Sequence, residues 1–205
     1  MVSENPILEM TTMEGRGKFL INMLEMLGEL KAGPLYAVET GCVRSLDLAY
    51  VTGDGYSTLY LARWAKNHGT KIVSIDNDAG HVEVAKRVLC QEGLESCVTF
   101  IVGSAADVLS MREEPIDLAY LDTAVDVVPT EILDEFNAVR KNVRSPALVA
   151  IDDSVGMYPC EDNKGALPLK LAKELDLQTG SCGRMLVIAF GEAASLLPRI
   201  QNLKL

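Results

Sequence analysis

Acidic residues and glycines follow several short apolar segments of this chain. Glu39 ends the first such segment, and a glycine-rich stretch follows at residues 53–58. Asp76 ends the second segment, 21 residues after Gly55, a spacing at which a carboxylate can accept hydrogen bonds from ribose hydroxyls. Glycines at a turn of this kind let the backbone approach a ligand closely. Together these residues indicate a site for a nucleotide-like ligand.

Three later apolar segments are also followed by small or acidic residues. Ser104 and Ala105 come after one segment, Asp122 after the next, and Asp152 with Asp153 after the last. Any one of these residues could be only a helix cap or part of a solvated turn. The whole set is harder to explain in this way, because like charges held at one rim repel each other. The set therefore indicates a cationic ligand or a metal ion.

The elements that would position these residues alternate between strands and helices. Five apolar segments predict strands that are buried on both faces, at residues 35–39, 71–75, 98–102, 116–121 and 147–151. Helices are predicted near residues 15–31, 57–67, 79–91, 105–111 and 167–175. A further helix opens at Pro129 and has Val143 on its apolar face. This alternation predicts a mostly parallel sheet with helices on both faces.

The end of the chain has a different pattern. Strands are predicted at about residues 176–181 and 185–190, separated by a tight link at Cys182 and Gly183, so that they can pair as an antiparallel hairpin. The predicted fold class is α/β, a Rossmann-like seven-stranded mostly parallel sheet with a C-terminal antiparallel hairpin. Ligands bind at the carboxyl ends of the strands in such sheets, where the polar residues described above are found.

We expect a single domain over residues 1–205. It would consist of an N-terminal helical lead-in at residues 1–33, the Rossmann-like core at residues 34–191 and a tail at residues 192–205.

The motifs resemble those of class I S-adenosylmethionine-dependent methyltransferases. Residues 38–41 with residues 53–58 look like the first motif of that family, Asp76 matches its ribose-binding acid, and residues 103–105 are similar to its third motif, at the adenine. The resemblance extends over about residues 35–190 and implies S-adenosylmethionine as the cofactor. The cofactor-binding residues that we predict are Glu39, Gly41, Gly53, Gly55, Tyr56, Ser57, Asp76, Ser104, Ala105 and Asp122. Glu39 would meet the ammonium group of the cofactor, and backbone N–H groups at Ser57 would meet its carboxylate.

A closer resemblance is to catechol and caffeoyl-coenzyme A O-methyltransferases. Asp122 and Asp152 match the two Asp ligands of the divalent ion in that family, and Asp153 stands where the family has Asn. The resemblance implies Mg²⁺ or another divalent cation at these three residues, which would grip the acceptor's hydroxyl oxygens and lower their pKa. We therefore predict methyl transfer to an oxygen of a small-molecule acceptor.

Two features depart from the O-methyltransferase pattern. That family has a lysine base three residues after its first metal-binding Asp, and this position is Val125 here. Lys164 could replace the lysine from the loop after the fifth strand, or it could be an ordinary solvated loop residue. Asp122 and Lys164 are thus the predicted catalytic residues. Residues 43–52 form an insertion in the first motif, either a flap over the cofactor or a structural loop.

Two other functions stay open on the sequence. A non-catalytic cofactor-binding or regulatory module of the same fold would explain the missing lysine and the split first motif. An NAD-dependent oxidoreductase would share the glycine turn and Asp76. Against the oxidoreductase, Thr58 replaces the third glycine of its motif, and the chain lacks the length for a substrate domain.

Composition limits the partners. The formal net charge is −10 and no Lys/Arg cluster offsets it, so we expect neither nucleic acid nor a membrane surface as a partner. The five cysteines are an odd number without a Cys-x-x-Cys pair, which favours reduced thiols in a cytoplasmic protein. We expect no signal peptide and no membrane-spanning segment. Surplus apolar surface on the helix at residues 15–31 could make a homodimer contact.

Overall fold

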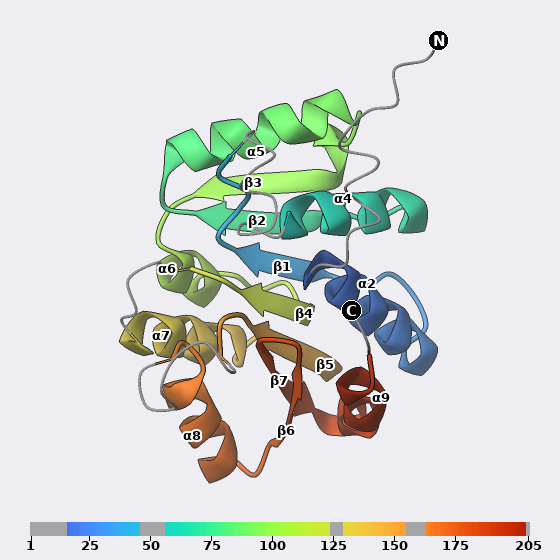
Figure 1. The fold of residues 1–205 in the computed structure, drawn as a ribbon, viewed down its shortest axis with the longest axis vertical. Helices are drawn as coiled ribbons and strands as arrows, with labels where there is room; N and C mark the ends of the chain where they lie inside the picture. Colours follow the sequence, from blue (N-terminus) through green and yellow to red (C-terminus); the bar gives the residue numbers. More distant parts are fainter. Residues whose placement is uncertain (1–15, 46–55, 124–128, 155–162, 204–205) are drawn as a thin grey trace.

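A computed structural model describes residues 16–45, 56–123, 129–154 and 163–203 of the chain. The strands within these ranges are β1 (Ala37–Thr40), β2 (Ile72–Asp76), β3 (Val98–Val102), β4 (Ile116–Leu121), β5 (Val143–Ile151), β6 (Gln178–Cys182) and β7 (Met185–Phe190). They form a seven-stranded sheet in the order β3-β2-β1-β4-β5-β7-β6. Strands β1 to β5 are parallel, and β7 runs antiparallel to both β5 and β6 (Figure 1). The predicted sheet with its C-terminal antiparallel hairpin is therefore confirmed.

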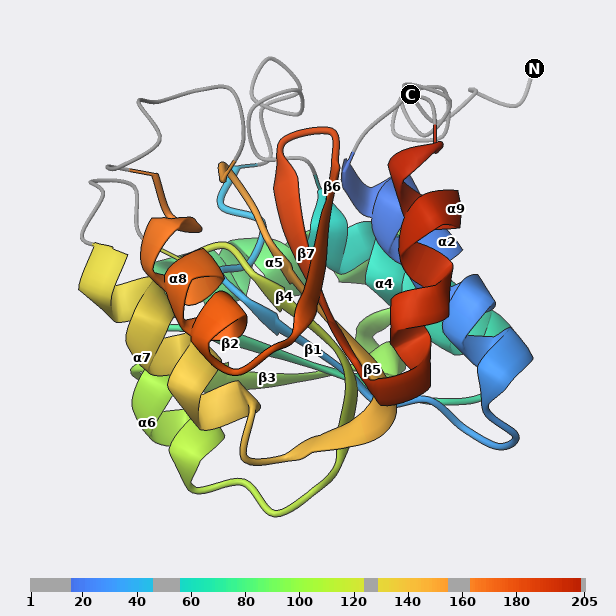
Figure 2. The ribbon, with the colours of Figure 1, turned by 90° about the horizontal axis from the view of Figure 1, so that it is seen from below.

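Helices cover both faces of this sheet (Figures 1 and 2). One face carries α2 (Arg16–Leu30), α4 (Ser57–His68), α5 (Ala79–Gln91), η3 (Gly191–Leu196) and α9 (Leu197–Gln201). The other face carries α6 (Ala105–Ser110), α7 (Pro129–Val139) and α8 (Ala166–Glu174). A short 3-10 helix, η2 (Glu95–Cys97), leads into β3. None of the helices in the described ranges is long and apolar enough to cross a membrane.

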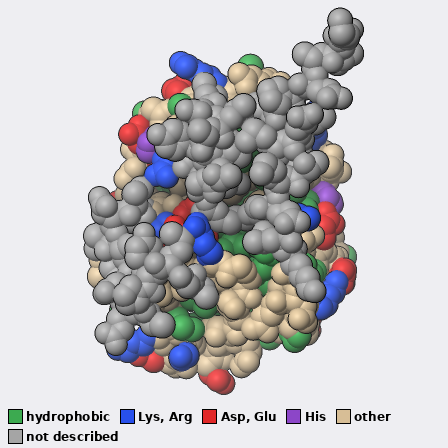
Figure 3. Space-filling model, in the orientation of Figure 1, with side chains coloured by type: hydrophobic (Ala, Val, Ile, Leu, Met, Phe, Trp, Pro, Cys, Tyr) green, Lys and Arg blue, Asp and Glu red, His purple; other side chains and the backbone are tan. Residues whose placement is uncertain are grey.

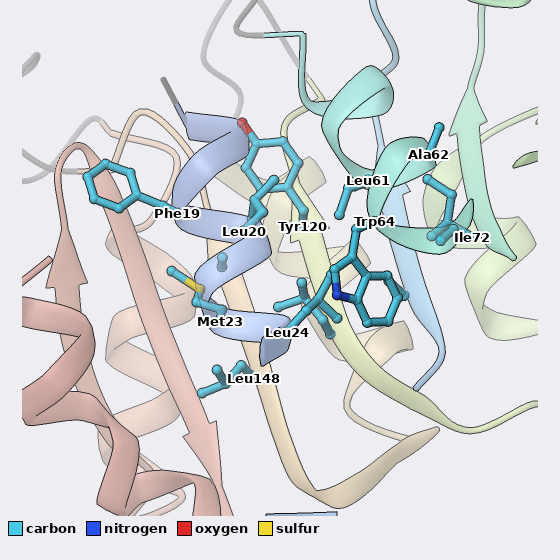
Figure 4. Packing of buried hydrophobic residues seen from close by; sticks show 14 of the residues in the cluster. Phe19, Leu20, Met23, Leu24, Leu61, Ala62, Trp64, Ile72, Tyr120 and Leu148 are labelled. Atoms are coloured by element: carbon cyan, nitrogen blue, oxygen red, sulfur yellow. The ribbon is translucent and has the colours of Figure 1, made fainter. Parts of the chain in front are cut away.

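The larger of the two apolar cores lies between the sheet and helices α2, α4 and α5. Leu20, Met23 and Leu24 recur along one side of α2 at helical spacing and are fully buried. Each such side chain contributes about 1.5–3 kcal/mol by leaving water. The ring of Tyr120, on β4, lies in the same cluster, and its hydroxyl oxygen is directed out of it (Figure 4). Tyr120 thus belongs to the core through its ring and to the edge of the sheet through its hydroxyl.

The boundary between α7 and β5 differs from the expectation. The helix that opens at Pro129 ends at Val139, and Val143 belongs to β5, which is longer than the predicted strand at residues 147–151. The side-chain amide of Asn142 donates to two backbone carbonyls at the end of α6. These long-range hydrogen bonds fix the chain reversal and end the helix early.

The C-terminal region also differs in two details. The hairpin link consists of Gly183 and Arg184, because Cys182 still pairs with Met185. The predicted tail at residues 192–205 contains most of η3 and all of α9, which pack on the larger core.

Candidate functional site

The carboxyl ends of the parallel strands lie along one edge of the sheet. Backbone hydrogen bonds continue the pairing one residue beyond the strands: Gly41 N donates to Ile75 O (2.8 Å), Gly103 N to Asp76 O (2.9 Å), Asp122 N to Thr40 O (3.0 Å) and Asp152 N to Leu121 O (3.0 Å). Each strand end is therefore held in register with its neighbour. The structure brings the predicted strand-end residues together, as the sheet topology requires.

Gly41 lets the ends of β1 and β4 approach each other. Its φ of +77° lies in the left-handed region. A Cβ at this position would lie 2.7 Å from the carbonyl oxygen of Asp122. Only glycine meets both conditions. The close approach at Gly41 is thus to the protein's own backbone, and its contact with a cofactor stays a prediction.

Glu39 is enclosed beneath the glycine turn. Its carboxylate accepts hydrogen bonds from the hydroxyls of Ser57 (2.5 Å), Thr58 (2.8 Å) and Ser74 (2.8 Å), and the residue has no exposed surface. Burial raises the pKa of Glu39 to about 7, although these hydroxyl donors lower it in part. Glu39 therefore ties the start of α4 to β1 and β2, and its predicted contact with an ammonium group stays a prediction.

The N-terminus of α4 faces the same edge without a side-chain cap. Tyr56 is its N-cap residue, with a left-handed φ of 48°, and the first turn contains no acidic residue. The backbone N–H groups at such a helix end favour an anion. Gly53 and Gly55 lie outside the described residues. So does most of the insertion at residues 43–52, so whether it forms a flap stays open.

Asp76 is buried at the end of β2, and its two carboxylate oxygens have different partners. Oδ2 accepts hydrogen bonds from the backbone N–H of Cys42 at 3.0 Å and from its thiol at 3.4 Å. Oδ1 accepts from the backbone N–H of Asp78 at 2.8 Å and lies 3.2 Å from Nδ1 of His81. The two amides fix the plane of the carboxylate. His81 is therefore a neighbour of the predicted ribose site.

Ser104 is the N-cap residue of α6. Its hydroxyl accepts a hydrogen bond from the N–H of Asp107, while Ala105 is buried behind it. A helix cap is thus one role of Ser104, and its exposed side chain is compatible with the predicted adenine contact as well.

Three carboxylates meet where β4 and β5 end. Oxygen atoms of Asp122, Asp152 and Asp153 lie within 4.8 Å of one another, and we call this group the acidic cluster. The hydroxyl of Tyr120 is 3.0 Å from Asp152 Oδ2 and 3.2 Å from Asp122 Oδ2. Asp153 has a left-handed φ of 48°, a conformation that Asp and Asn adopt more readily than other residues with a side chain. The structure thus brings these three predicted carboxylates together.

Two cations of the chain contact the acidic cluster. Nζ of Lys164 lies 2.8 Å from Asp122 Oδ1 and 3.7 Å from Asp153 Oδ2. Nη2 of Arg184 lies 2.5 Å from Asp153 Oδ1 and 3.9 Å from Asp152 Oδ2. Figure 3 shows acidic and basic side chains next to each other near the middle of one face, between the segments drawn in grey. Lys164 is therefore not a solvated loop residue, since only 7% of its side chain is exposed.

A packed turn at residues 163–165 positions Lys164 beside the acidic cluster. Its neighbour Asn163 is buried and accepts a hydrogen bond from Gly165 N through its own Oδ1. A Cβ at Gly165 would lie 2.5 Å from Oγ of Ser154, so the start of α8 rests directly on the end of β5. Ser154 N in turn donates to the carbonyl oxygen of Arg184. The same contacts therefore place both cations.

Comparison with known proteins agrees with this geometry. A family model described as a methyltransferase domain matches residues 51–154, just over half of the 205 residues. The chain belongs to this family of methyltransferase domains. No curated protein matches this methyltransferase.

Solved structures share the fold of this methyltransferase. An O-methyltransferase from Bacillus cereus in complex with SAH is 19% identical, with a TM-score of 0.62 over 85% of this chain and 80% of that one. The O-methyltransferase TomG from Streptomyces achromogenes in complex with SAM is 22% identical, with a TM-score of 0.61 over 86% of this chain and 80% of that one. A methyltransferase from Geobacter sulfurreducens is 19% identical, with a TM-score of 0.61 over 92% of this chain and 90% of that one. The predicted class I methyltransferase fold is confirmed.

The divalent ion implied by the O-methyltransferase resemblance does not fit the arrangement of the described residues. Carboxylate oxygens are suitable ligands for Mg²⁺, which needs near-octahedral coordination at about 2.0–2.1 Å. In this methyltransferase, however, Lys164 and Arg184 already contact the acidic cluster. A divalent ion among the carboxylates would lie beside two positive charges, which repel it.

Three residues of the site were missed on the sequence. Arg184 lies in the hairpin link, and nothing local indicates its partner. Tyr120 is on β4 and precedes Asp122, the first residue after the strand, by two positions, so period-2 spacing could have placed the two side chains on the same side. Glu135 follows Ile132 by three positions, on the buried side of α7, and accepts hydrogen bonds from the hydroxyls of Thr40 and Thr123. Burial raises the pKa of Glu135 to about 7.

Proposed function

We propose that this methyltransferase transfers a methyl group from S-adenosylmethionine to an oxygen of a small-molecule acceptor. The observation that carries the proposal is the position of the Asp122–Lys164 pair beside the predicted cofactor residues. Asp122 N is bonded to Thr40 of β1, the residue before the turn at Gly41. The O-methyltransferases that hold SAM or SAH in the same fold support this choice of cofactor and reaction.

The chain offers groups for the carboxylate, the ribose and the adenine of the cofactor. The uncapped N-terminus of α4 suits its carboxylate. Asp76 suits its ribose, because two backbone amides hold the carboxylate in place. The Cys42 thiol and the His81 ring are the partners that ribose hydroxyls would replace. Ser104 and Ala105 would lie beside the adenine.

The bound cofactor supplies the methyl group, whose bond to sulfur breaks as the bond to the acceptor oxygen forms, with the electron pair staying on sulfur. The acceptor's hydroxyl proton is lost to solvent. The ammonium group of Lys164 would stabilise negative charge on the acceptor oxygen, and Asp122 would hold that ammonium in place. Alignment of the reacting atoms supplies much of the remaining catalysis.

The net charge of the chain and the position of the acidic cluster favour one class of acceptor. A net charge of −10 disfavours nucleic acid, and the acidic cluster lies at the same edge as the cofactor residues. We therefore expect a small hydroxylated molecule. The cytoplasmic location and a homodimer stay expectations of the same kind.

The test is transfer of an isotope-labelled methyl group from S-adenosylmethionine to a panel of phenols, enols and hydroxy acids, followed by mass spectrometry. We expect the wild type to label at least one acceptor class on oxygen and Lys164→Ala to lose most of this labelling. Cofactor binding without any labelled acceptor across the panel would instead indicate a non-catalytic module of the same fold.

A further inference from the structure

We propose that Lys164, assisted by Arg184, is the resident cation of the acidic cluster, so that this protein works without a divalent metal ion. The proposal departs from the metal-dependent O-methyltransferases that the acidic residues resemble. It follows from what the described side chains do at Asp122, Asp152 and Asp153.

Lys164 and Arg184 lie where a metal ion would have to be coordinated. Nζ of Lys164 lies 2.8 Å from Asp122 and 3.7 Å from Asp153, and thus contacts two of the three carboxylates that would have to coordinate a metal. Nη2 of Arg184 contacts the remaining carboxylate of Asp152 at 3.9 Å, and Asp153 at 2.5 Å. A metal ion coordinated by the three carboxylates would lie beside both cations or displace them.

The charge of the acidic cluster is largely balanced by the two cations. Two cations face three carboxylates among the described residues, so the cluster carries an excess of one negative charge. The Tyr120 hydroxyl adds a hydrogen-bond donor to the same oxygens. Burial makes an unpaired charge costly, and this cluster already balances most of its charge internally. A divalent ion would reverse the sign of the excess and would sit beside an ammonium and a guanidinium group.

Packing of the neighbouring residues holds Lys164 in place. Gly165 packs against Ser154 so closely that a Cβ would overlap Oγ, and Asn163 is buried on the other side of Lys164. The side chain of Lys164 is 7% exposed, which leaves it little freedom to leave the cluster. A metal ion could displace a solvated lysine from the carboxylates. Lys164 is instead held near them by the packing at the start of α8.

The proposal has a consequence for the acceptor, which rests on the proposed function. A metal ion chelates two vicinal oxygens, whereas an ammonium group donates separate hydrogen bonds and can serve a single oxygen. Acceptors with one hydroxyl group should therefore be as suitable as those with two.

The experiment is a titration of the purified protein with Mn²⁺, followed by electron paramagnetic resonance, without cofactor or acceptor. We expect no saturable Mn²⁺ binding by the wild type at millimolar concentrations. Lys164→Ala should bind Mn²⁺ at least about tenfold more tightly, because the three carboxylates lose their cation. The double variant Lys164→Ala with Asp152→Asn should lose this binding again. Lys170→Ala, which removes an exposed lysine of α8, should behave as the wild type.

Saturable Mn²⁺ binding by the wild type that Asp152→Asn abolishes would overturn the proposal, whatever the reaction is. Binding of Mn²⁺ no tighter in Lys164→Ala than in the wild type would overturn it too. If Lys164→Ala does not fold, Lys164→Gln, which keeps most of the side-chain length but removes the charge, takes its place in the same titration. Because the readout is metal binding alone, failure of the proposed methyl transfer would leave this result unchanged, and the two ideas can fail separately.

Discussion

The ammonium nitrogen of Lys164 lies 2.8 Å from Oδ1 of Asp122, although the two residues are 42 positions apart in the sequence. The pair connects the end of β4 to the start of α8 across the carboxyl edge of the sheet. In the proposed function, this pair places a positive charge where an acceptor oxygen would approach the cofactor. The stability of this pair and its chemistry can be tested separately.

The ion pair should contribute to stability. Lys164→Ala leaves the carboxylates of the acidic cluster without their main partner, and removal of one member of a buried ion pair typically costs about 3–5 kcal/mol. Because Asp122 is 20% exposed, we expect a loss of about 2–3 kcal/mol in the free energy of unfolding, measured by urea denaturation. Lys170→Ala should change it by less than about 0.5 kcal/mol. Strictly additive effects of Lys164→Ala and Asp122→Asn would show that the two residues do not interact.

The pKa of Glu39 should make stability depend on pH. Its pKa is about 7 in the folded protein and 4.5 as the ordinary value, so between these pH values the folded state keeps a proton that the unfolded state has lost. The free energy of unfolding should therefore fall as pH rises from 4.5 to 7, by about 3 kcal/mol at most from this group. Below pH 4.5 the carboxyl is protonated in both states and contributes no slope.

The measurement is urea unfolding of the wild type and Glu39→Gln across this pH range. Glu39→Gln should show a smaller decline than the wild type, while Glu83→Gln, at an exposed position of α5, should follow the wild type. Parallel curves for the wild type and Glu39→Gln would mean that Glu39 does not titrate in this range.

Two glycines should respond to alanine in opposite directions. Gly41→Ala puts a Cβ 2.7 Å from the carbonyl oxygen of Asp122 at a φ of +77°, and we expect it to lower the melting temperature, with a loss of about 1–3 kcal/mol. Gly28, on the exposed side of α2, has no atom within 4 Å of the position of an added Cβ. Gly28→Ala should raise stability by up to about 1 kcal/mol, because alanine favours helix. Calorimetry would check both, and an unchanged melting temperature for Gly41→Ala would refute the close approach.

The sheet was predictable because its signals are local. Apolar segments such as residues 98–102 and 116–121 predict buried strands without knowledge of their partners, and the acids that follow them are placed by topology. The link between the last two strands was predicted one residue too early, since Cys182 continues the ladder. The acidic cluster could therefore be predicted from the acids that follow the strands in the sequence.

The partners of the acidic cluster were less predictable because they come from distant parts of the chain. Lys164 was recognised only as a candidate, since a loop lysine is solvated unless tertiary contacts such as Gly165 on Ser154 bury it. Arg184 lies in a hairpin link, where an arginine has no local signature. The metal prediction was based on the three acids alone. The two cations that face these acids would repel a divalent ion.

Substitutions in the predicted cofactor and acceptor regions should affect cofactor affinity differently. Asp76→Ala removes the predicted ribose partner and should weaken S-adenosylhomocysteine binding by about 10- to 100-fold, the value of one or two hydrogen bonds to a charged group. Lys164→Ala should leave this affinity within about twofold, because it acts on the acceptor. Calorimetric titration of both variants, with Asp134→Asn as an exposed control on α7, would show this. Equal losses in the two variants would mean that the cofactor and acceptor regions are not distinct.

We expect this chain to bind S-adenosylmethionine at the carboxyl edge of its sheet. The most direct measurement is calorimetric titration of the purified wild type with S-adenosylhomocysteine, which binds in the same way but cannot react. We expect saturable binding with one molecule per chain, unchanged by Mg²⁺ or by a chelator. Absence of binding, with and without Mg²⁺, would contradict it.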